Sequence, residues 1–230
     1  MKTLIQAEDG SKALVRGGVS QWPTIMDTVH DTSNAALLHY LDFLLADTSL
    51  LTEAAQRSHR HQLGFIKIVL LAEGTGACLR LHLWDRESVE KEDIHSHCAD
   101  FSSRVMLGRL SENSYELTPG ANYARFRYSF DTAMGCSVAV ADGLTDVSLV
   151  ASRVMLAGDI YTKRAFDLHN VSNVTQGTLT VSAWSTRNTE ALVLKSDLEA
   201  SARDCSAPIG MSESELRVTL CSIKERIIRR

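Results

Sequence analysis

The spacing of hydrophobic residues changes twice along the chain and divides it into three segments. From about residue 23 to residue 58, apolar residues recur three and four positions apart, which is the period of an amphipathic helix. Two helix N-caps are expected, because Asp, Thr and Ser side chains accept hydrogen bonds from free backbone N–H groups. The first would be one of residues 31–33 (Asp-Thr-Ser), and the second either Thr48 or Ser49. We therefore expect a helical extension over residues 1–60.

The middle segment, residues 61–200, is rich in short runs of β-branched and aromatic residues. Turn signals built from Gly, Pro, Thr and Asp separate several of these runs, at residues 74–76, 118–120 and 142–143. Many short strands in succession favour an all-β core of antiparallel sheets, either sandwiched or closed into a barrel. The expected strands are residues 65–72, 77–84, 102–110, 114–117, 122–130, 137–141, 147–156, 178–184 and 191–194.

The C-terminal segment, residues 201–230, contains another helical pattern. Ser212 and Glu215 form a capping box, in which each side chain bonds to the backbone N–H of the other residue. We expect this helix to pack on the outside of the β core or on a second subunit of a homodimer. The apolar stripe that would make this contact consists of Leu216, Leu220, Ile223 and Ile227.

Composition and charge narrow the classes of partner. The chain has 230 residues, 44% of them hydrophobic, and a formal net charge of −4, so it lacks the basic surface that nucleic acid requires. Its first residues contain no apolar signal region, and no stretch approaches the roughly 18 apolar residues of a membrane span. Five cysteines without CxxC spacing indicate reduced thiols. We expect a cytoplasmic protein that binds neither nucleic acid nor membrane.

Two histidines, His95 and His97, lie shortly before the strand expected at residues 102–110. Residues two apart in a strand point to the same face, so both imidazoles could bind one ion. A third ligand would come from a distant strand, and His169 is the strongest candidate. Three neutral imidazoles would leave positions on the metal open for substrate or oxygen. The alternatives are an exposed polar pair at 95 and 97, or a site that includes the carboxylate of Asp167.

These residues resemble the cupins, and among them the thiol dioxygenases of the cysteine dioxygenase type. The resemblance covers roughly residues 65–195 and implies a jelly-roll barrel. Most cupins add a Glu shortly after the second histidine, but residues 99–102 here are Ala-Asp-Phe-Ser. Thiol dioxygenases also lack that Glu and bind Fe(II) through three histidines, so the resemblance implies Fe(II) here. Zn, Ni and Mn are the alternatives, because histidine binds all of these metals. The positions that carry the resemblance are His95, His97, Gly108, Gly158, Asp159, Tyr161 and His169.

The run Leu79–Trp84 alternates leucines with polar or aromatic residues. Its second face carries Arg80, His82 and Trp84. This face either lines a pocket or is exposed to solvent, with a helix covering Trp84. In the resemblance, Trp84 takes the place of a pocket tryptophan, which favours the first reading. Lys67 takes the place of the Arg that holds the substrate carboxylate in that family, although Lys cannot make the bidentate contact of Arg.

The residues and the resemblance together favour a non-haem iron(II) oxygenase that acts on a small, amino-acid-like or carboxylate-bearing metabolite with dioxygen. Lys67, Arg80 and Trp84 are the expected substrate-binding residues, and His82 and Tyr161 the candidate catalytic residues. Two other classes remain open, a metal-dependent lyase or isomerase and a non-catalytic ligand-binding cupin.

Overall fold

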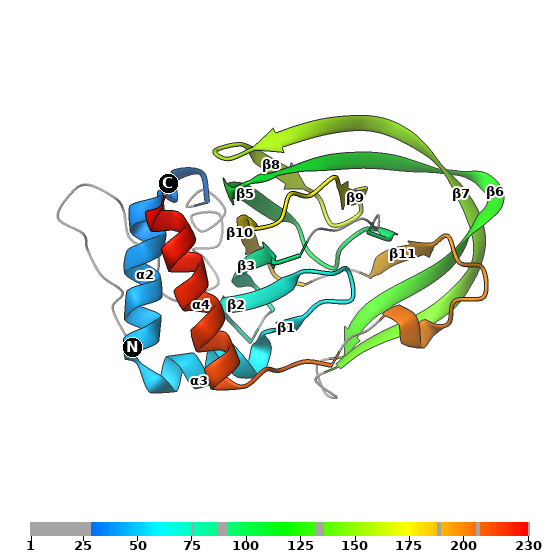
Figure 1. Ribbon diagram of the computed structural model, residues 1–230. Helices are drawn as coiled ribbons and strands as arrows, with labels where there is room; N and C mark the ends of the chain where they lie inside the picture. The colour runs from blue at the N-terminus through cyan, green and yellow to red at the C-terminus, as the bar shows by residue number, and fades with distance from the viewer. Residues whose placement is uncertain are drawn as a thin grey trace.

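The protein is built from two antiparallel sheets with helices on one side, in a computed structural model that describes residues 29–74, 76–86, 92–131, 136–187, 190–205 and 208–229 (Figure 1). The helices are α2 (Asn34–Ala46), α3 (Thr48–Arg57), the 3-10 helix η2 (Ala202–Cys205) and α4 (Glu213–Ile228). The strands are β1 (His59–Arg60), β2 (Ile66–Ala72), β3 (Cys78–Trp84), β4 (Ile94–His95), β5 (Phe101–Leu107), β6 (Arg109–Asp131), β7 (Cys136–Leu156), β8 (Ile160–Lys163), β9 (Leu168–Ser172), β10 (Thr178–Trp184) and β11 (Ala191–Lys195).

The strand order is that of a jelly roll. One sheet has the order β1-β2-β3-β10-β5-β8, and the other β11-β4-β9-β6-β7. Within them, β3-β10-β5-β8 and β4-β9-β6-β7 form the two four-stranded halves. Successive strands from β3 to β10 alternate between the sheets, except for the hairpin of β6 and β7, as in two Greek keys. The predicted all-β core with a jelly-roll barrel and flanking helices is therefore confirmed.

Alternation in the strands of the six-stranded sheet separates two cores. The outward-facing residues of β3, namely Leu79, Leu81 and Leu83, are buried against α2, α3 and α4 together with apolar residues of β2 and β10. The helical stripe at residues 216, 220, 223 and 227 belongs to the same core. The inward-facing residues point toward the five-stranded sheet, and their apolar members form a second core that includes Trp84. Both faces of this sheet are consequently covered.

The helix caps follow the sequence closely. The Ser33 hydroxyl accepts a hydrogen bond from the Ala36 N–H, and the Ser212 hydroxyl accepts one from the Glu215 N–H. The second cap differs from the prediction, because Asp47 rather than Thr48 or Ser49 precedes α3 and accepts from the Leu50 N–H at 3.0 Å. A carboxylate at this position also complements the helix dipole, which a hydroxyl cannot do.

Two of the three predicted turns are wrong. Residues 118–120 and 142–143 lie inside β6 and β7, which pair with each other along almost their whole length. The turn-forming residues are absorbed where the pairing register shifts, between Thr118 and Tyr123 and between Ala124 and Phe126, because a bulge accommodates extra residues by bending the strand. The bent hairpin pairs with β9 through residues 111–115 and with β11 through residues 124–128 (Figure 1).

No helix in the described part of the chain is long and apolar enough to cross a membrane.

Candidate metal centre and cavity

Three histidines converge on the inner side of the five-stranded sheet. His95 in β4 is directly opposite His169 in β9, and His97 follows His95 by two residues. The ring centroids are 4.7 Å apart for His95 and His97, 4.9 Å for His95 and His169, and 5.0 Å for His97 and His169. One ligand nitrogen from each ring lies within 4.8 Å of the other two, so the group can hold a metal ion.

Hydrogen bonds direct the ring nitrogens of this cluster. The Nδ1 of His95 lies 2.8 Å from the backbone oxygen of Asp93, to which it donates, so its Nε2 carries no proton in the neutral ring and is available as a ligand. The Nε2 atoms of His97 and His169 are 2.8 Å apart, and one donates to the other. The backbone N–H of His97 is held by the Ala165 oxygen at 2.7 Å.

The electrostatic environment keeps all three imidazoles neutral. Burial lowers the pKa of His95, His97 and His169 below the usual histidine value, and for His97 the neighbouring imidazoles lower it further. Neutral imidazole is the form of histidine that binds metals. The donor set, its burial and its protonation therefore fit a metal ion held by three nitrogens.

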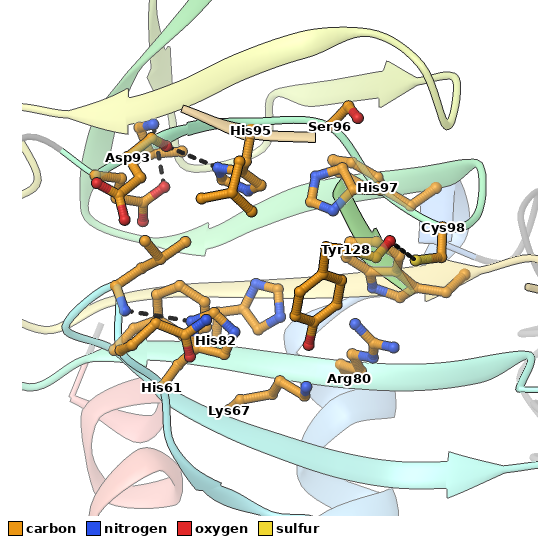
Figure 2. Close-up of a pocket in the computed structure, with 18 of the residues that line it drawn as sticks. His61, Lys67, Arg80, His82, Asp93, His95, Ser96, His97, Cys98 and Tyr128 are labelled. Carbon is orange, nitrogen blue, oxygen red and sulfur yellow. Dashed lines mark hydrogen bonds between the residues drawn. The ribbon is translucent and has the colours of Figure 1, made fainter. Parts of the chain in front are cut away.

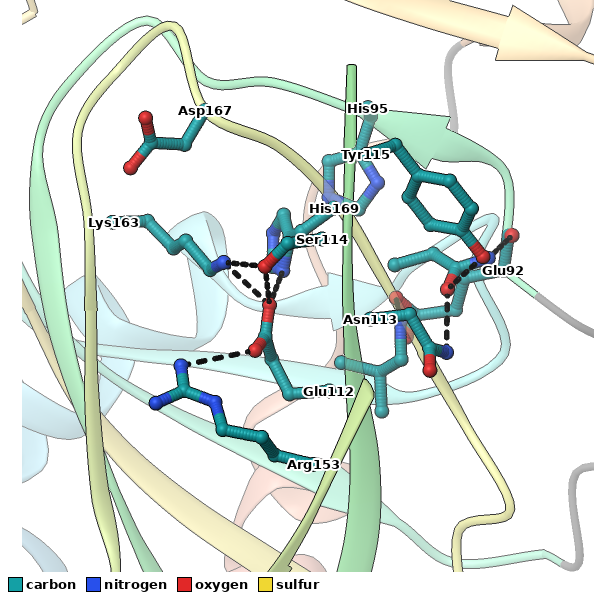
Figure 3. Close-up of polar contacts among 12 residues, drawn as sticks. Glu92, His95, Glu112, Asn113, Ser114, Tyr115, Arg153, Lys163, Asp167 and His169 are labelled. Atoms are coloured by element: carbon teal, nitrogen blue, oxygen red, sulfur yellow. Dashed lines mark hydrogen bonds and ion pairs between the residues drawn. The ribbon is translucent and has the colours of Figure 1, made fainter. Parts of the chain in front are cut away.

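A buried carboxylate, Glu112 in β6, lies behind His169. Its Oε1 is 3.9 Å from the Nδ1 of His169 and 2.5 Å from the Nζ of Lys163, while its Oε2 is 3.3 Å from a guanidinium nitrogen of Arg153 (Figure 3). The Ser114 hydroxyl donates to the same carboxylate and accepts from Lys163. Glu112 has no exposed surface, and Lys163 balances its charge. Carboxylates in this position orient the ligand histidine of a metal site.

The three histidines form one wall of a cavity of about 590 Å³ between the sheets (Figure 2). The opposite wall belongs to the six-stranded sheet and carries Lys67 and Arg80, two of the substrate-binding residues expected from the sequence. The third, Trp84, lies on β3 like Arg80 and also lines the cavity. The two catalytic candidates, His82 and Tyr161, also line the cavity. The structure thus brings all eight predicted site residues to one cavity, whose size suits a small metabolite.

Cross-strand pairing aligns polar residues on the wall opposite the histidine cluster. His59, Lys67, His82 and Thr180 are successive partners across β1, β2, β3 and β10, so their side chains share one face of the sheet. Within the described part of the chain, His59 Nδ1, His82 Nε2 and Thr180 Oγ1 are buried without a hydrogen-bond partner. Buried polar atoms of this kind normally have partners, and of these three residues His59 and His82 line the cavity, where a polar ligand could pair with them.

Arg80 is held in the next row by two contacts. Its guanidinium carbon lies 4.2 Å from the ring centroid of Trp184, and its Nε donates to the Cys78 sulfur at 2.9 Å. Neither of these two contacts uses the terminal nitrogens of the guanidinium. No carboxylate among the described residues forms an ion pair with Arg80.

Tyr161 in β8 is buried and interacts with the Ser103 hydroxyl, which lies 3.1 Å from the Ser182 hydroxyl. Burial raises the pKa of Tyr161 above the usual tyrosine value, so its hydroxyl stays protonated at neutral pH. In this state it can donate a hydrogen bond but cannot serve as a base.

Two carboxyl groups in or beside the cavity were missed by the sequence analysis. Glu92 lines the cavity, accepts a hydrogen bond from the Val171 N–H at 3.2 Å through Oε2, and has no hydrogen-bond partner for Oε1 among the described residues. Burial raises its pKa to about 8, against smaller opposing effects of Val171 and the nearby Trp84 indole. Glu112 is the other, and it lies between two expected strands, residues 102–110 and 114–117, where the local sequence carried no signal for it.

Two nearby carboxylates, one of them the Asp167 alternative considered from the sequence, do not join the cluster. Asp167 accepts a hydrogen bond from the Arg164 N–H at 2.8 Å, and Asp100 accepts one from the Ala165 N–H at 2.7 Å. Both carboxylates therefore close a turn near His169 instead of pointing at the three rings, and neither belongs to the ligand group.

Comparisons with known proteins find partial structural similarity and no matching sequence. No protein-family model and no curated protein sequence matches this chain. An oxalate oxidase in complex with the substrate analogue glycolate is similar over 64% of this chain and 63% of its own, with 14% identity and a TM-score of 0.33. A second oxalate oxidase structure is similar over 66% of this chain and 62% of its own, with 13% identity and a TM-score of 0.28. The match spans less than two thirds of the length of each oxalate oxidase. At this level of similarity, neither oxalate oxidase structure assigns an activity to this chain.

Proposed function

We propose that this protein is a metal-dependent enzyme of the cupin type, and specifically a non-haem iron(II) oxygenase acting on a small amino-acid-like or carboxylate-bearing metabolite. The observation that carries the proposal is the convergence of His95, His97 and His169 in the wall of a cavity of about 590 Å³. A bound Fe(II) would supply activation of dioxygen, and three neutral ligands would leave the ion with its full charge to attract an anionic substrate.

The residues of the chain itself would bind and orient the substrate. Lys67 and Arg80 would hold a carboxylate on the wall opposite the metal ligands, and Trp84 would close the apolar side of the cavity. His82 would orient the substrate through its unpaired Nε2, and the protonated Tyr161 hydroxyl would donate a hydrogen bond to it. Burial of these groups excludes water and strengthens their electrostatic effect on the substrate.

The test begins with the metal content of protein purified without chelator, with Zn, Ni and Mn measured beside iron. Anaerobic loading with iron(II) is followed by oxygen-uptake measurements on a panel of small thiols, amino acids and other carboxylates. The proposal expects close to one equivalent of metal and substrate-dependent uptake. His97→Ala should lose both, whereas His39→Ala, which alters an exposed histidine on α2, should lose neither. Wild-type protein that takes up no metal would refute the metal centre.

Glu92 supports a second candidate, a metal-dependent lyase or isomerase. Its carboxyl lines the same cavity, has one free oxygen, and has a pKa near 8, which suits a group that exchanges protons with a substrate near neutral pH. A bound Zn, Ni or Mn would act as a Lewis acid in this case. Metal content with turnover but without oxygen uptake would favour this candidate over the oxygenase.

A further inference from the structure

The imidazole of His97 is held differently from the other two rings of the cluster. His95 donates to the Asp93 backbone oxygen at 2.8 Å, and the Nδ1 of His169 faces Glu112 at 3.9 Å. For the His97 ring, the described part of the chain supplies one hydrogen bond, and it comes from the cluster itself, between its Nε2 and that of His169 at 2.8 Å. An ion bound by both Nε2 atoms leaves no proton between them, so this bond cannot hold His97 in a metal centre.

Two aromatic rings take the place of a polar partner for His97. The centroid of the His97 ring lies 4.9 Å from that of Phe101 and 4.8 Å from that of Trp184, with interplanar angles of 86° and 79°. Near-perpendicular arrangements at this separation are favourable for aromatic rings. Phe101 in β5 and Trp184 in β10 belong to the six-stranded sheet, whereas His97 follows β4 of the five-stranded sheet. These contacts therefore join the two sheets at the histidine cluster.

Cross-strand pairing fixes the two aromatic rings relative to each other. Trp184 is opposite Phe101 on one side and Cys78 on the other, and Phe101 is opposite Lys163 in β8. Directly opposite residues point to the same face, so the four side chains form one row across the inner side of the sheet. Within this row the rings of Phe101 and Trp184 stack at 4.3 Å and 18°. At its end Lys163 pairs with Glu112, the carboxylate behind the third histidine.

Arg80 restrains the indole of Trp184 further. Its guanidinium carbon lies 4.2 Å from the ring centroid of Trp184, and its Nε donates to the sulfur of Cys78 in the same row at 2.9 Å. Moving the indole away from His97 would break its contacts with both Arg80 and Phe101. Since Phe101 and Trp184 are also buried, the packing of the row restrains both rings where they meet His97.

We infer that Phe101 and Trp184 are positioning residues of the metal centre, and that they form an aromatic clamp that fixes the His97 imidazole within the cluster. The clamp does for His97 what the Asp93 oxygen and Glu112 do for the other two histidines, since groups behind a ligand determine the orientation of its ring. It differs in one respect, because ring contacts hold an imidazole without selecting its tautomer. The inference rests on the proposed function, in which His97 is a metal ligand.

Loss of one ring of the clamp should weaken metal binding by a limited factor. A perpendicular aromatic pair contributes enough to change an equilibrium constant about 3- to 10-fold. Phe101→Leu and Trp184→Leu should each weaken zinc(II) binding by this factor, and the double variant should weaken it more than either. Trp184→Phe keeps an aromatic ring next to His97, so it should bind zinc(II) more tightly than Trp184→Leu.

The experiment is a titration of the chelator-treated full chain with zinc(II), in competition with a chromogenic chelator. Phe126→Leu is the matched control, because Phe126 in β6 is as buried as Phe101, at 3% exposure, and packs in a different core from the clamp. Urea denaturation of the metal-free variants measures the loss of stability that each substitution causes. Phe126→Leu should lose stability as Phe101→Leu does, but it should bind zinc(II) as wild type does.

Cobalt(II) gives a second readout, because its visible absorption depends on the geometry of its ligands. Phe101→Leu and Trp184→Leu should alter the spectrum of the bound ion. Phe126→Leu should leave it unchanged, since a general loss of packing does not move the His97 ring.

Zinc(II) affinities of Phe101→Leu and Trp184→Leu equal to that of Phe126→Leu would overturn the inference while the metal centre stands. An equal loss in Trp184→Phe and Trp184→Leu would also overturn it, because the volume of the side chain and not the ring contact would then matter. Wild-type protein that binds neither zinc(II) nor cobalt(II) would instead refute the proposed metal centre, and with it the ligand role that the clamp serves. The two failures are therefore distinguishable.

Discussion

The Nδ1 atom of His169 lies 3.9 Å from Oε1 of Glu112, a carboxylate with no exposed surface. His169 presents its Nε2 to His97 on the other side of the ring, 2.8 Å away. For His169 to bind a metal through Nε2, its proton must be on Nδ1, which faces Glu112. Glu112 therefore favours the tautomer that a metal ligand needs, and its Oε1 also pairs with the Lys163 Nζ at 2.5 Å.

Glu112→Gln should weaken metal binding and destabilise the fold together. Loss of the carboxylate leaves the ammonium of Lys163, whose side chain is only 6% exposed, without its partner, at a cost on the order of 3–5 kcal/mol. The double variant Glu112→Gln/Lys163→Met removes both charges and should recover most of that stability. Its metal affinity should still be roughly 10- to 100-fold weaker than that of wild type.

Chemical denaturation and metal titration of both variants separate the two roles of Glu112. A double variant that recovers stability and wild-type metal affinity together would show that Glu112 serves only to neutralise Lys163.

Gly108→Ala should lower stability through the backbone between β5 and β6. Gly108 has a φ of +76°, and an added Cβ would lie 2.8 Å from the Thr178 Cα and 2.3 Å from its hydroxyl. The strain and the clash with β10 should together cost about 2–4 kcal/mol. Gly74→Ala is the matched control, since its Cβ would meet nothing within 4 Å. Melting temperatures of both variants test this prediction. An equal shift in both would show that the backbone conformation of Gly108 and its contact with Thr178 are not what destabilises Gly108→Ala.

Local periodicity was sufficient to predict which side chains of β3 share one face, whereas the choice of the cavity as the environment of that face came from the resemblance to thiol dioxygenases. Arg80, His82 and Trp84 share a face because residues two apart always do in a regular strand, and the leucines between them were bound to face the other way. The same rule placed His95 and His97 together, and Ser33 and Ser212 were readable as caps because a cap acts on residues three positions away.

Features that depend on pairing between distant strands could not be predicted in this way. Glu112 reaches His169 because β6 and β9 are neighbours with Ser114 opposite His169, a register that no local pattern encodes. The Thr118-Pro119-Gly120 run has the composition of a turn, but tertiary pairing with β7 absorbs it as a bulge. The choice of His169 as the third cluster member came from the resemblance to cupins and not from its local sequence.

Acid should destabilise the metal-free protein, and His59 should account for a defined share of this loss. Burial lowers the pKa of His59 to about 4, below the value of about 6.5 in an unfolded chain. Between these values the unfolded state binds more protons than the folded state, so stability falls as the pH falls from about 6.5 to about 4. By pH 5 this group alone should cost about 2 kcal/mol.

His59→Gln isolates that contribution. The free energy of unfolding, measured with urea at pH 7 and at pH 5, should fall less in the variant than in wild type by roughly this amount. An identical loss in both proteins would show that His59 is not held neutral in the folded state.

Glu92→Gln should make the protein more stable while it impairs turnover. The folded protein keeps Glu92 protonated up to about pH 8, whereas the unfolded chain ionises it near pH 4.5, so at pH 7 this carboxyl opposes folding by about 3 kcal/mol. Gln retains the uncharged shape, and its oxygen can still accept the hydrogen bond from the Val171 N–H. The variant should therefore gain about 2–3 kcal/mol in the free energy of unfolding at pH 7, and the gain should shrink as the pH falls toward 4.5.

Urea denaturation of wild type and Glu92→Gln at both pH values measures this gain, and metal content and turnover are measured on the same preparations. Unchanged metal content with reduced turnover would place Glu92 among the residues that act on the substrate, because it lies outside the ligand group. A variant that is less stable than wild type at pH 7 would mean that the carboxyl is ionised and paired in the folded protein, which would remove the basis for proton exchange by Glu92.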